Sequence, residues 1–334
     1  MENNLTIWHE LHDTAKAWND LKPWQYFKCN DWIKIDFENE ETIYCTIMGY
    51  DNKCIGLSIY LGDKGYEDLC SIITKPIDDT VTTYMMYDQT CLTFYMGDRE
   101  EVPPKQKKLI KDLGFKYRGR GNWPYFLSYK KRFSPYHIND NQAFTIIRVM
   151  KKLMEITNLY INNKIDVKFD ENEIIHAYQK KDNWSYEPLC LPTPVDKFCA
   201  IEIADKSILE QASLAPNNYR RLIIDLVYMK FSITENDFDR PINPLMFIVL
   251  DEETQMIMAT HFLSPDDDEI GLVLSFLIEY ILKEGRPDCL FIRNPAVWAA
   301  IVDVCKECDI ELITTPLQMI DYIISDMCHS FIDR

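Results

Sequence analysis

Apolar residues along the chain recur either at three- and four-residue intervals or in β-rich runs, and these two patterns predict its elements. The helical pattern marks four segments of the first half: Leu5–Asp20, the residues around Leu69 and Ile72, a basic segment from Pro103 to Gly114, and a long segment that Asn139 or Asp140 caps. β-rich runs mark four strands: Thr42–Met48, Ile55–Leu61, Cys91–Tyr95 and Trp123–Tyr129. The first half is therefore predicted to be an α+β domain.

The middle of the chain is less regular. Pro188, Pro192 and Pro194 interrupt any helix there, because proline lacks the N–H that a helix interior needs. We expect an α+β domain over residues 1–160, an irregular connector with strands over 161–214, and a second domain over 215–334.

Strands and helices alternate more clearly in the second half. The predicted strands are Arg221–Phe231, Pro244–Leu250, Met256–Leu263, Cys289–Ile292 and Ile310–Thr314. One predicted helix follows Asp266-Asp267-Asp268 and ends at Gly285, one begins at Pro295, and one spans Leu317–Met327. The predicted order is β-β-β-α-β-α-β-α, which is that of an α/β domain.

This order resembles that of ribonuclease H-like domains, and the runs around Asp225, Asp251 and Ile292 resemble strands of integrase- and transposase-type cores. The resemblance implies a catalytic Asp at Asp225 and a second one at the position of Arg293, with Asp321 as a candidate third acid. Two-metal hydrolysis requires several carboxylates to converge on the cations, and an arginine among them repels Mg²⁺. We therefore expect the fold without the catalysis, with a metal-dependent nuclease as the alternative.

Charge is distributed unevenly. The chain of 334 residues has 36 Lys and Arg against 53 Asp and Glu, a formal net charge of −17. Residues 105–132 contain ten basic side chains and one acidic, whereas residues 1–104 have a net charge of −11 and residues 215–334 one of −12. The acidic total argues against broad contact with nucleic acid, and it leaves the basic segment 105–132 as the place where an anionic partner would bind.

The basic segment also contains aromatic residues and glycines. Arg118 and Arg120 flank Gly119, which favours a phosphate or carboxylate site, and nearby aromatic rings favour stacking on a planar ligand. The candidate binding residues are Arg99, Arg118, Arg120, Asn122, Trp123 and Tyr125. The alternative interpretation is structural: Trp123 and Phe126 belong to the core, and the arginines pair with the protein's own acids.

Residues Tyr117 to Pro124, with Gly97-Asp98-Arg99 before them, resemble an aromatic-Arg-Gly-Lys-Asn-Ala-Trp-Pro motif of an uncharacterised bacterial two-domain family. Leu21-Lys22-Pro23-Trp24 and the turn from Tyr60 to Gly65 are similar to the same family, so the resemblance covers most of the chain. The chain departs from the motif at Arg120 and Gly121. The resemblance implies the two-domain organisation and no activity.

Other motifs point to no cofactor. Cys305 and Cys308 form a C-x-x-C without a second pair at zinc-finger spacing, and His9 and His12 lack the following Glu of a metalloprotease helix. The chain has no P-loop, no G-x-G-x-x-G and no G-x-S-x-G. We expect no cofactor and no bound metal.

The sequence thus predicts a non-catalytic binding or interaction protein. Its expected partner is an anionic ligand or a protein that contacts the basic segment, with nucleic acid possible but less favoured. No apolar run approaches the roughly 18 residues of a membrane span, and no export signal precedes the eleven cysteines, so we expect a cytoplasmic protein with no membrane contact.

Overall fold

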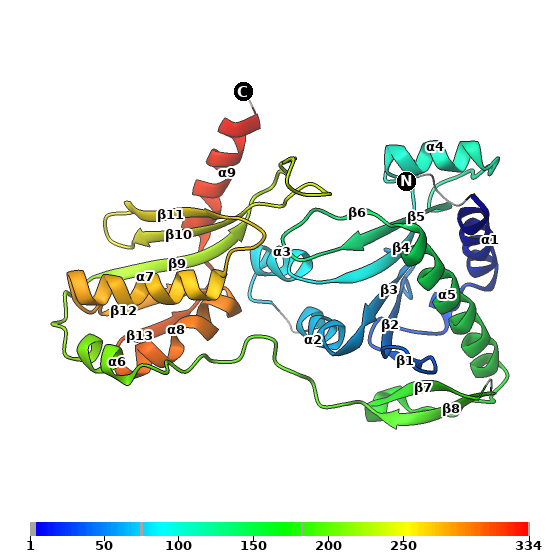
Figure 1. Cartoon of the computed structure of the whole chain (residues 1–334), viewed down its shortest axis with the longest axis horizontal. Helices are drawn as coiled ribbons and strands as arrows, with labels where there is room; N and C mark the ends of the chain where they lie inside the picture. The colour runs from blue at the N-terminus through cyan, green and yellow to red at the C-terminus, as the bar shows by residue number, and fades with distance from the viewer. Residues whose placement is uncertain (1–4, 74–75, 182, 333–334) are drawn as a thin grey trace. The chain divides into compact units, whose positions relative to one another are not determined.

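The computed structural model of the chain describes residues 5–73, 76–181 and 183–332 (Figure 1). These residues form two compact units, each made of separate chain segments. The N-terminal unit contains residues 5–73, 89–130 and 135–195, and the C-terminal unit contains residues 76–88, 131–134 and 196–332. No helix of the described residues is both long and apolar enough to cross a membrane.

The N-terminal unit is built on an eight-stranded sheet with the order β6-β5-β4-β3-β2-β1-β7-β8. Its strands are β1 (Ile33–Asp36), β2 (Ile43–Met48), β3 (Gly56–Leu61), β4 (Cys91–Gly97), β5 (Trp123–Tyr129), β6 (Tyr136–His137), β7 (Glu173–Lys180) and β8 (Asn183–Cys190). β1 and β7 are parallel, and the other neighbouring strands are antiparallel. β7 and β8 come from the segment expected to be a connector, and β7 continues the sheet beyond β1.

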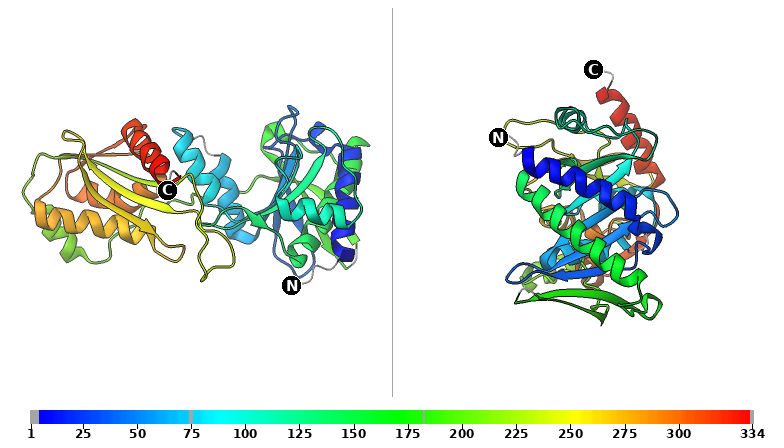
Figure 2. Two further views of the ribbon diagram at one scale, coloured as in Figure 1. Left: turned by 90° about the horizontal axis from the view of Figure 1, so that it is seen from above. Right: turned by 90° about the vertical axis from the view of Figure 1, so that its right-hand side faces the viewer.

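The helices of this unit cover the sheet on both faces. They are α1 (Leu5–Leu21), η1 (Pro23–Gln25), α2 (Gly62–Ile73), α4 (Pro104–Asp112), α5 (Asp140–Ile161) and η2 (Phe169–Glu171). α1 and α5 cross one face and bury its main core, as the right-hand view of Figure 2 shows. α2 packs with Trp32, Tyr44 and Tyr60 on the opposite face.

Local sequence explains where α5 and β5 lie. Of the two candidate caps, Asn139 and Asp140, it is Asn139 that caps α5: its side chain accepts a hydrogen bond from the Gln142 N–H, and the Gln142 side chain accepts one from the Asn139 N–H, both at 2.9 Å. β5 spans the predicted residues and alternates between buried and half-buried positions, so Phe126 enters the core while Trp123 and Tyr125 lie on the other face.

The C-terminal unit is built on a five-stranded sheet with the order β11-β10-β9-β12-β13. Its strands are β9 (Arg221–Tyr228), β10 (Leu245–Asp251), β11 (Ile257–Leu263), β12 (Cys289–Ile292) and β13 (Glu311–Thr314). β9, β10 and β11 are antiparallel neighbours, and β12 and β13 run parallel to β9. β9 and β10 are almost entirely buried because both faces of the sheet are covered at these strands.

Helices pack on the two faces of this sheet. The unit contains α3 (Asp79–Tyr87), α6 (Lys206–Ser213), α7 (Glu269–Glu284), α8 (Pro295–Glu307) and α9 (Gln318–Ile332). One face packs against α6, α7 and α8, and Leu317, Ile320 and Ile324, at and within the start of α9, pack on the other (Figure 1). α3 precedes β4 in the chain, yet Tyr84 of α3 lies in the core of the C-terminal unit. The predicted mixture of helices and strands in both halves is confirmed.

Candidate functional site

The C-terminal unit holds a buried arginine surrounded by carboxylates. Arg293 directly follows β12, and continuing the register of β12 with β9 places it opposite Asp225. Its Nε donates to Asp225 Oδ2 at 2.8 Å, and its Nη1 donates to Asp78 Oδ2 at 2.9 Å. Asp321 of α9 accepts from Nη1 at 3.0 Å and from Nη2 at 2.7 Å. Both sequence-predicted acids, Asp225 and Asp321, therefore contact the same guanidinium.

Neighbouring groups fix this cluster in place. The other oxygen of Asp78 caps α3 by accepting from the Val81 N–H at 2.9 Å, and Thr80 donates to Asp321 at 2.9 Å. Asn294 caps α8 and donates to the Leu226 carbonyl at 2.9 Å. The guanidinium thus joins β9, β12, α3 and α9 at one point.

The electrostatics of the cluster follow from burial and from an excess of acid. The Arg293 side chain is 0% exposed and that of Asp225 is 1% exposed. Burial raises the pKa of Asp225 to about 7, and this effect exceeds the opposing attraction of Arg293. Burial by itself lowers the pKa of the Arg293 guanidinium, but the hydrogen bonds to Asp321 and the charge of Asp225 together outweigh it and raise this pKa, so the group stays charged.

Metal binding requires ligand atoms that are free to coordinate. Among the described residues, no group of three or more His, Cys, Asp or Glu side chains is arranged to hold a metal ion. Asp78, Asp225 and Asp321 do converge, but the Arg293 guanidinium lies between them and uses their oxygens. The cation in this cluster is therefore the guanidinium of Arg293, which is covalently part of the chain.

A second charged network involves the end of the basic segment. Lys131 lies 3.2 Å from Asp88 and 2.5 Å from Glu269, and Arg132 donates to Glu269 at 2.5 Å. Lys197 completes the network at 2.9 Å from Asp88. These groups all belong to the C-terminal unit. For Lys131 and Arg132, the structural interpretation of the basic segment therefore holds.

The rest of the basic segment lies in the N-terminal unit and is differently arranged. Within the described part of the chain, no carboxylate lies within 4.0 Å of the side-chain nitrogens of Lys105, Lys108, Lys111, Lys116, Arg118 or Arg120. These side chains are exposed. These six basic side chains therefore form no ion pair with the acidic residues that the structure describes.

Some of the predicted binding residues meet at a pocket of about 260 Å³. Arg118 and Asn122 line it with Lys16 and Lys116, and Asp20 is the one acidic residue of its lining. The Asn122 amide donates to the Arg118 carbonyl at 3.2 Å, which holds the loop closed. We name this the basic pocket.

The other predicted binding residues lie outside the pocket lining. Arg99 lies over the Trp123 ring at 5.8 Å, and that ring is 5.9 Å from Tyr117, which does line the pocket. Tyr125 stacks on Tyr95 at 5.3 Å, and Arg120 is exposed. Lys16 is the basic-pocket residue that sequence reasoning missed, because it lies on α1, one hundred residues before Lys116.

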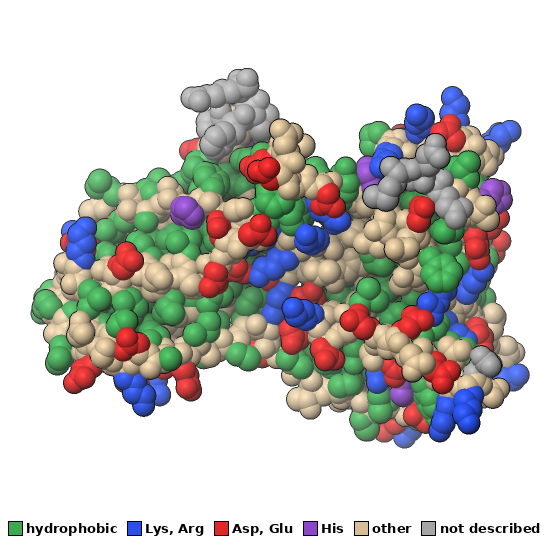
Figure 3. Space-filling model, viewed as in Figure 1, with side chains coloured by type: hydrophobic (Ala, Val, Ile, Leu, Met, Phe, Trp, Pro, Cys, Tyr) green, Lys and Arg blue, Asp and Glu red, His purple; other side chains and the backbone are tan. Residues whose placement is uncertain are grey.

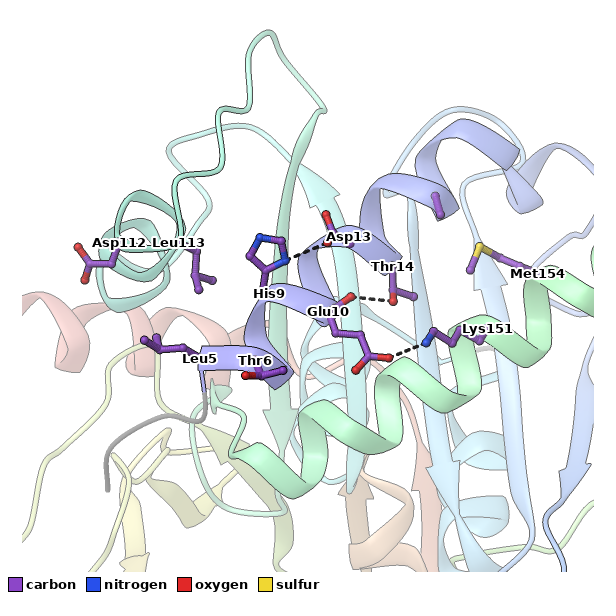
Figure 4. Close-up of a pocket in the computed structure, with 11 residues that line it drawn as sticks. Leu5, Thr6, His9, Glu10, Asp13, Thr14, Asp112, Leu113, Lys151 and Met154 are labelled. Carbon is purple, nitrogen blue, oxygen red and sulfur yellow. Dashed lines mark hydrogen bonds and ion pairs between the residues drawn. The ribbon is translucent and has the colours of Figure 1, made fainter.

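A larger pocket of about 790 Å³ lies beside α1 (Figure 4). Its lining contains two polar pairs: His9 lies 2.9 Å from Asp13, and Glu10 lies 2.6 Å from Lys151. His12 is buried instead, bonded to the Tyr117 hydroxyl at 3.1 Å, and burial lowers its pKa to about 4. The two histidines do not converge on one site.

Comparison with known families follows the two halves of the chain. Residues 8–177, about half of its length, match the sequence profile of a family described as a domain of unknown function, DUF7309. The chain belongs to the DUF7309 family. Residues 209–328 match a second domain of unknown function, DUF6930. A search of curated proteins finds no match.

The two matched ranges separate the sites along the sequence. The basic pocket lies wholly within the DUF7309 range. The arginine cluster combines Asp78 from the DUF7309 range with Asp225, Arg293 and Asp321 from the DUF6930 range. The chain thus consists of two family domains in tandem, as the resemblance to a two-domain family implied.

Proposed function

We propose that this protein is a binding protein whose C-terminal unit is ribonuclease H-like and has a guanidinium where such enzymes hold metal ions. The sheet order β11-β10-β9-β12-β13 and the strand directions support that fold assignment. The observation that carries the proposal is Arg293, which stands where the resemblance implies an acid and is bonded to the two other implied acids, Asp225 and Asp321, as well as to Asp78.

The chemistry of phosphodiester hydrolysis gives the reason. Two-metal catalysis places cations that activate water and stabilise the leaving oxygen, and their ligands are carboxylate oxygens. The carboxylate oxygens of Asp225 and Asp321 instead accept hydrogen bonds from the Arg293 guanidinium, which carries no coordinated water and cannot act as a Lewis acid. The same guanidinium repels an incoming Mg²⁺.

A nuclease assay tests this part of the proposal. The full chain is incubated with Mg²⁺ or Mn²⁺ and with labelled single-stranded and double-stranded DNA and RNA, and we expect no cleavage above background. Metal-dependent cleavage by the native protein that Asp225→Asn and Asp321→Asn abolish would establish the nuclease alternative, which the convergence of the three acids favours.

We assign the binding function to the basic pocket of the N-terminal unit, with an anionic ligand as its occupant. Lys16, Lys116 and Arg118 surround the pocket against one carboxylate, Asp20, and Lys116 and Arg118 have no ion pair among the described residues. An anion that binds Lys116 and Arg118 therefore gains charge-assisted hydrogen bonds without displacing an ion pair of these two residues, whereas Lys16 also lies 4.0 Å from Asp13. An acidic protein segment fits the same chemistry.

Titration with simple probes tests the anion site. Inorganic phosphate, pyrophosphate and a labelled oligonucleotide are titrated against the native chain and against Lys116→Ala/Arg118→Ala, which removes two basic side chains of the pocket lining. We expect the double variant to lose at least about tenfold in affinity, since each charge-assisted bond contributes about 1.5–3 kcal/mol. Lys105→Ala/Lys108→Ala is the matched control, because these exposed lysines lie on α4 outside the pocket.

The outcomes separate the ligand classes. Equal binding by the native chain and the Lys116→Ala/Arg118→Ala variant would overturn the anion site. Binding of the oligonucleotide alone, falling steeply with salt, would favour nucleic acid over a small anion.

We place this function in the cytoplasm. The eleven cysteines all lie among the described residues and form no disulfide, and seven of them are buried as small apolar side chains. This usage fits a reducing compartment.

A further inference from the structure

The C-terminal unit has a strand edge with one pairing partner. β11 is at the end of the sheet, and among the described residues it pairs only with β10 (Figure 1). Every strand has backbone N–H and C=O groups on both sides, so the outer side of β11 offers a row of groups able to pair with another strand. The edge spans Ile257–Leu263, which is long enough for several ladder hydrogen bonds.

The side chains of this edge are apolar and exposed. Met256 is 67% exposed, Ile257 49% and Phe262 44%. The surface over β10 and β11 in Figure 3 consists mainly of apolar and uncharged polar groups. Exposed apolar residues gathered on one strand are typical of an interaction site rather than of a solvated surface.

β11 also lacks the charged side chains that usually prevent an edge strand from pairing with another chain. Natural edge strands carry lysine, proline or inward-pointing charges that prevent pairing with other chains. Residues 255–264 contain no charged residue, and no Lys or Arg occurs from 241 to 282. Acids lie at both ends instead: Glu253 before β11, and Asp266, Asp267 and Asp268 after it, all exposed.

We propose that β11 binds an extended segment of another protein that has apolar residues at its centre and Lys or Arg at both ends. The segment would add a sixth strand to the sheet, with backbone hydrogen bonds supplying affinity and the flanking charges supplying specificity. This site is in the C-terminal unit and does not depend on the anion site proposed above.

The charge pattern argues against a second copy of this chain as the occupant. Antiparallel self-pairing of Ile257–Leu263 centred on Thr260 would bring the acidic turn at residues 252–253 of each copy near the acids at residues 266–268 of the other, beyond the ends of the ladder. Like charges held near one another repel, which disfavours this pairing. A partner with Lys or Arg at both ends would instead be attracted to these acidic residues.

Two synthetic peptides test the proposal on the full chain. Both have five alternating valine and threonine residues, and one has two lysines at each end where the other has two glutamates. We expect the lysine-flanked peptide to bind at least about tenfold more tightly at 50 mM salt, with the difference shrinking as salt screens the charges. Amide hydrogen exchange should slow at residues 257–263 when this peptide is bound.

Matched variants locate the site. Met258→Lys/Thr260→Lys places positive charge on the edge and should weaken the lysine-flanked peptide at least about tenfold. Tyr322→Lys, at a 73% exposed position on α9, is the control and should leave binding unchanged. Glu253→Gln/Asp266→Asn should reduce the preference for lysine over glutamate ends.

Several outcomes would overturn the proposal. They are equal affinity for the two peptides, exchange protection outside β11, and absence of binding to either peptide. A concentration-dependent dimer that Met258→Lys/Thr260→Lys disrupts would assign the edge to a second copy instead.

Discussion

Arg293 neutralises acids that are held in or beside the core of the C-terminal unit. Asp225 is buried, whereas Asp78 and Asp321 are partly exposed, so Asp225 depends most on the guanidinium for its charge to be tolerated. Removing one member of a buried ion pair leaves the other uncompensated, which costs more than the pair itself contributes.

The variant Arg293→Ala is expected to lower the free energy of unfolding of the C-terminal unit by about 3–5 kcal/mol. Amide hydrogen exchange of β9 measures this loss within the intact chain. Arg221→Ala is the control, because Arg221 pairs with Glu252 at the surface and should contribute about 0–1 kcal/mol. Similar losses for the two variants would contradict the role assigned to Arg293.

Asp225 also predicts a dependence of stability on pH. Its native pKa is raised to about 7, whereas an unfolded Asp loses its proton near pH 4, so the native state binds more protons between these values. This carboxyl's contribution to stability is therefore complete below about pH 4 and is lost as the pH rises to about 7, with a slope of at most about 1.4 kcal/mol per pH unit. Asp225→Asn should consequently become more stable relative to the native protein across this interval.

Urea unfolding of both proteins from pH 4 to pH 8 measures the difference. A difference that stays constant with pH would show that Asp225 is ionised throughout.

Among the elements, β5 has on one side a side chain that makes the backbone hydrogen bonds a neighbouring strand would otherwise make. β6 pairs only with Leu127 and Ser128, and Gln106 of α4 bonds to Phe126 instead. The Gln106 amide donates to the Phe126 carbonyl at 2.6 Å, and its oxygen accepts from the Phe126 N–H at 3.0 Å. Gln106 is 3% exposed, so α4 is anchored to the sheet by a buried carboxamide.

Gln106→Ala should therefore destabilise the N-terminal unit by about 1–3 kcal/mol, because it leaves buried donor and acceptor groups of Phe126 without partners. The Phe126 amide should exchange with solvent faster in this variant. Gln106→Glu keeps the acceptor and loses the donor, so protection of that amide should be largely retained. Equal loss of protection in both variants would contradict the pairing.

The elements also show what the sequence can and cannot predict. β5 could be predicted because Trp123–Tyr129 is a β-rich run, and α5 because Asn139 or Asp140 precedes apolar residues at helical spacing. α3 was not predicted, because its buried residues are tyrosine, valine and methionine in a run that favours no single period. Asp78 was missed at the arginine cluster for a related reason: it is 215 positions from Arg293, and only tertiary structure brings the two together.

At the scale of the whole molecule, the C-terminal unit is not one continuous stretch of chain. It takes α3 and residues 131–134 from between segments of the N-terminal unit. These short segments supply Asp78 to the arginine cluster, Tyr84 to the core, and Lys131 and Arg132 to Glu269. The second family match begins at residue 209, but the compact unit that contains it also includes residues 76–88 and 131–134.

A fragment of residues 196–334 should consequently fold poorly. Without α3 it exposes the core surface that Tyr84 covers, Glu269 loses Lys131 and Arg132, and Arg293 loses Asp78, so we expect a broadened thermal transition and fast exchange in β9. A synthetic peptide of residues 76–90 added to the fragment should slow that exchange. A fragment that unfolds as sharply as the full chain would show that α3 is dispensable.

The basic segment is divided in the same way. Lys131 and Arg132 neutralise acids of the C-terminal unit, while Lys116 and Arg118 line the basic pocket of the N-terminal unit. One stretch that looked uniform in charge therefore has a structural part and a part available to a ligand. The sequence gives the total charge of the segment, and only the contacts show which basic side chains form ion pairs within the protein and which line the pocket.

The covalent attachment of the cation at the arginine cluster has one more consequence. A metal ion in that place would be supplied by the cell, would exchange with competing metals, and would be removed by a chelator. Arg293 is made with the chain and stays with it, so the cluster forms in every molecule at once, whatever the metal content of its surroundings. The C-terminal unit therefore has its stabilising cation as soon as the chain is synthesised and needs none from its surroundings.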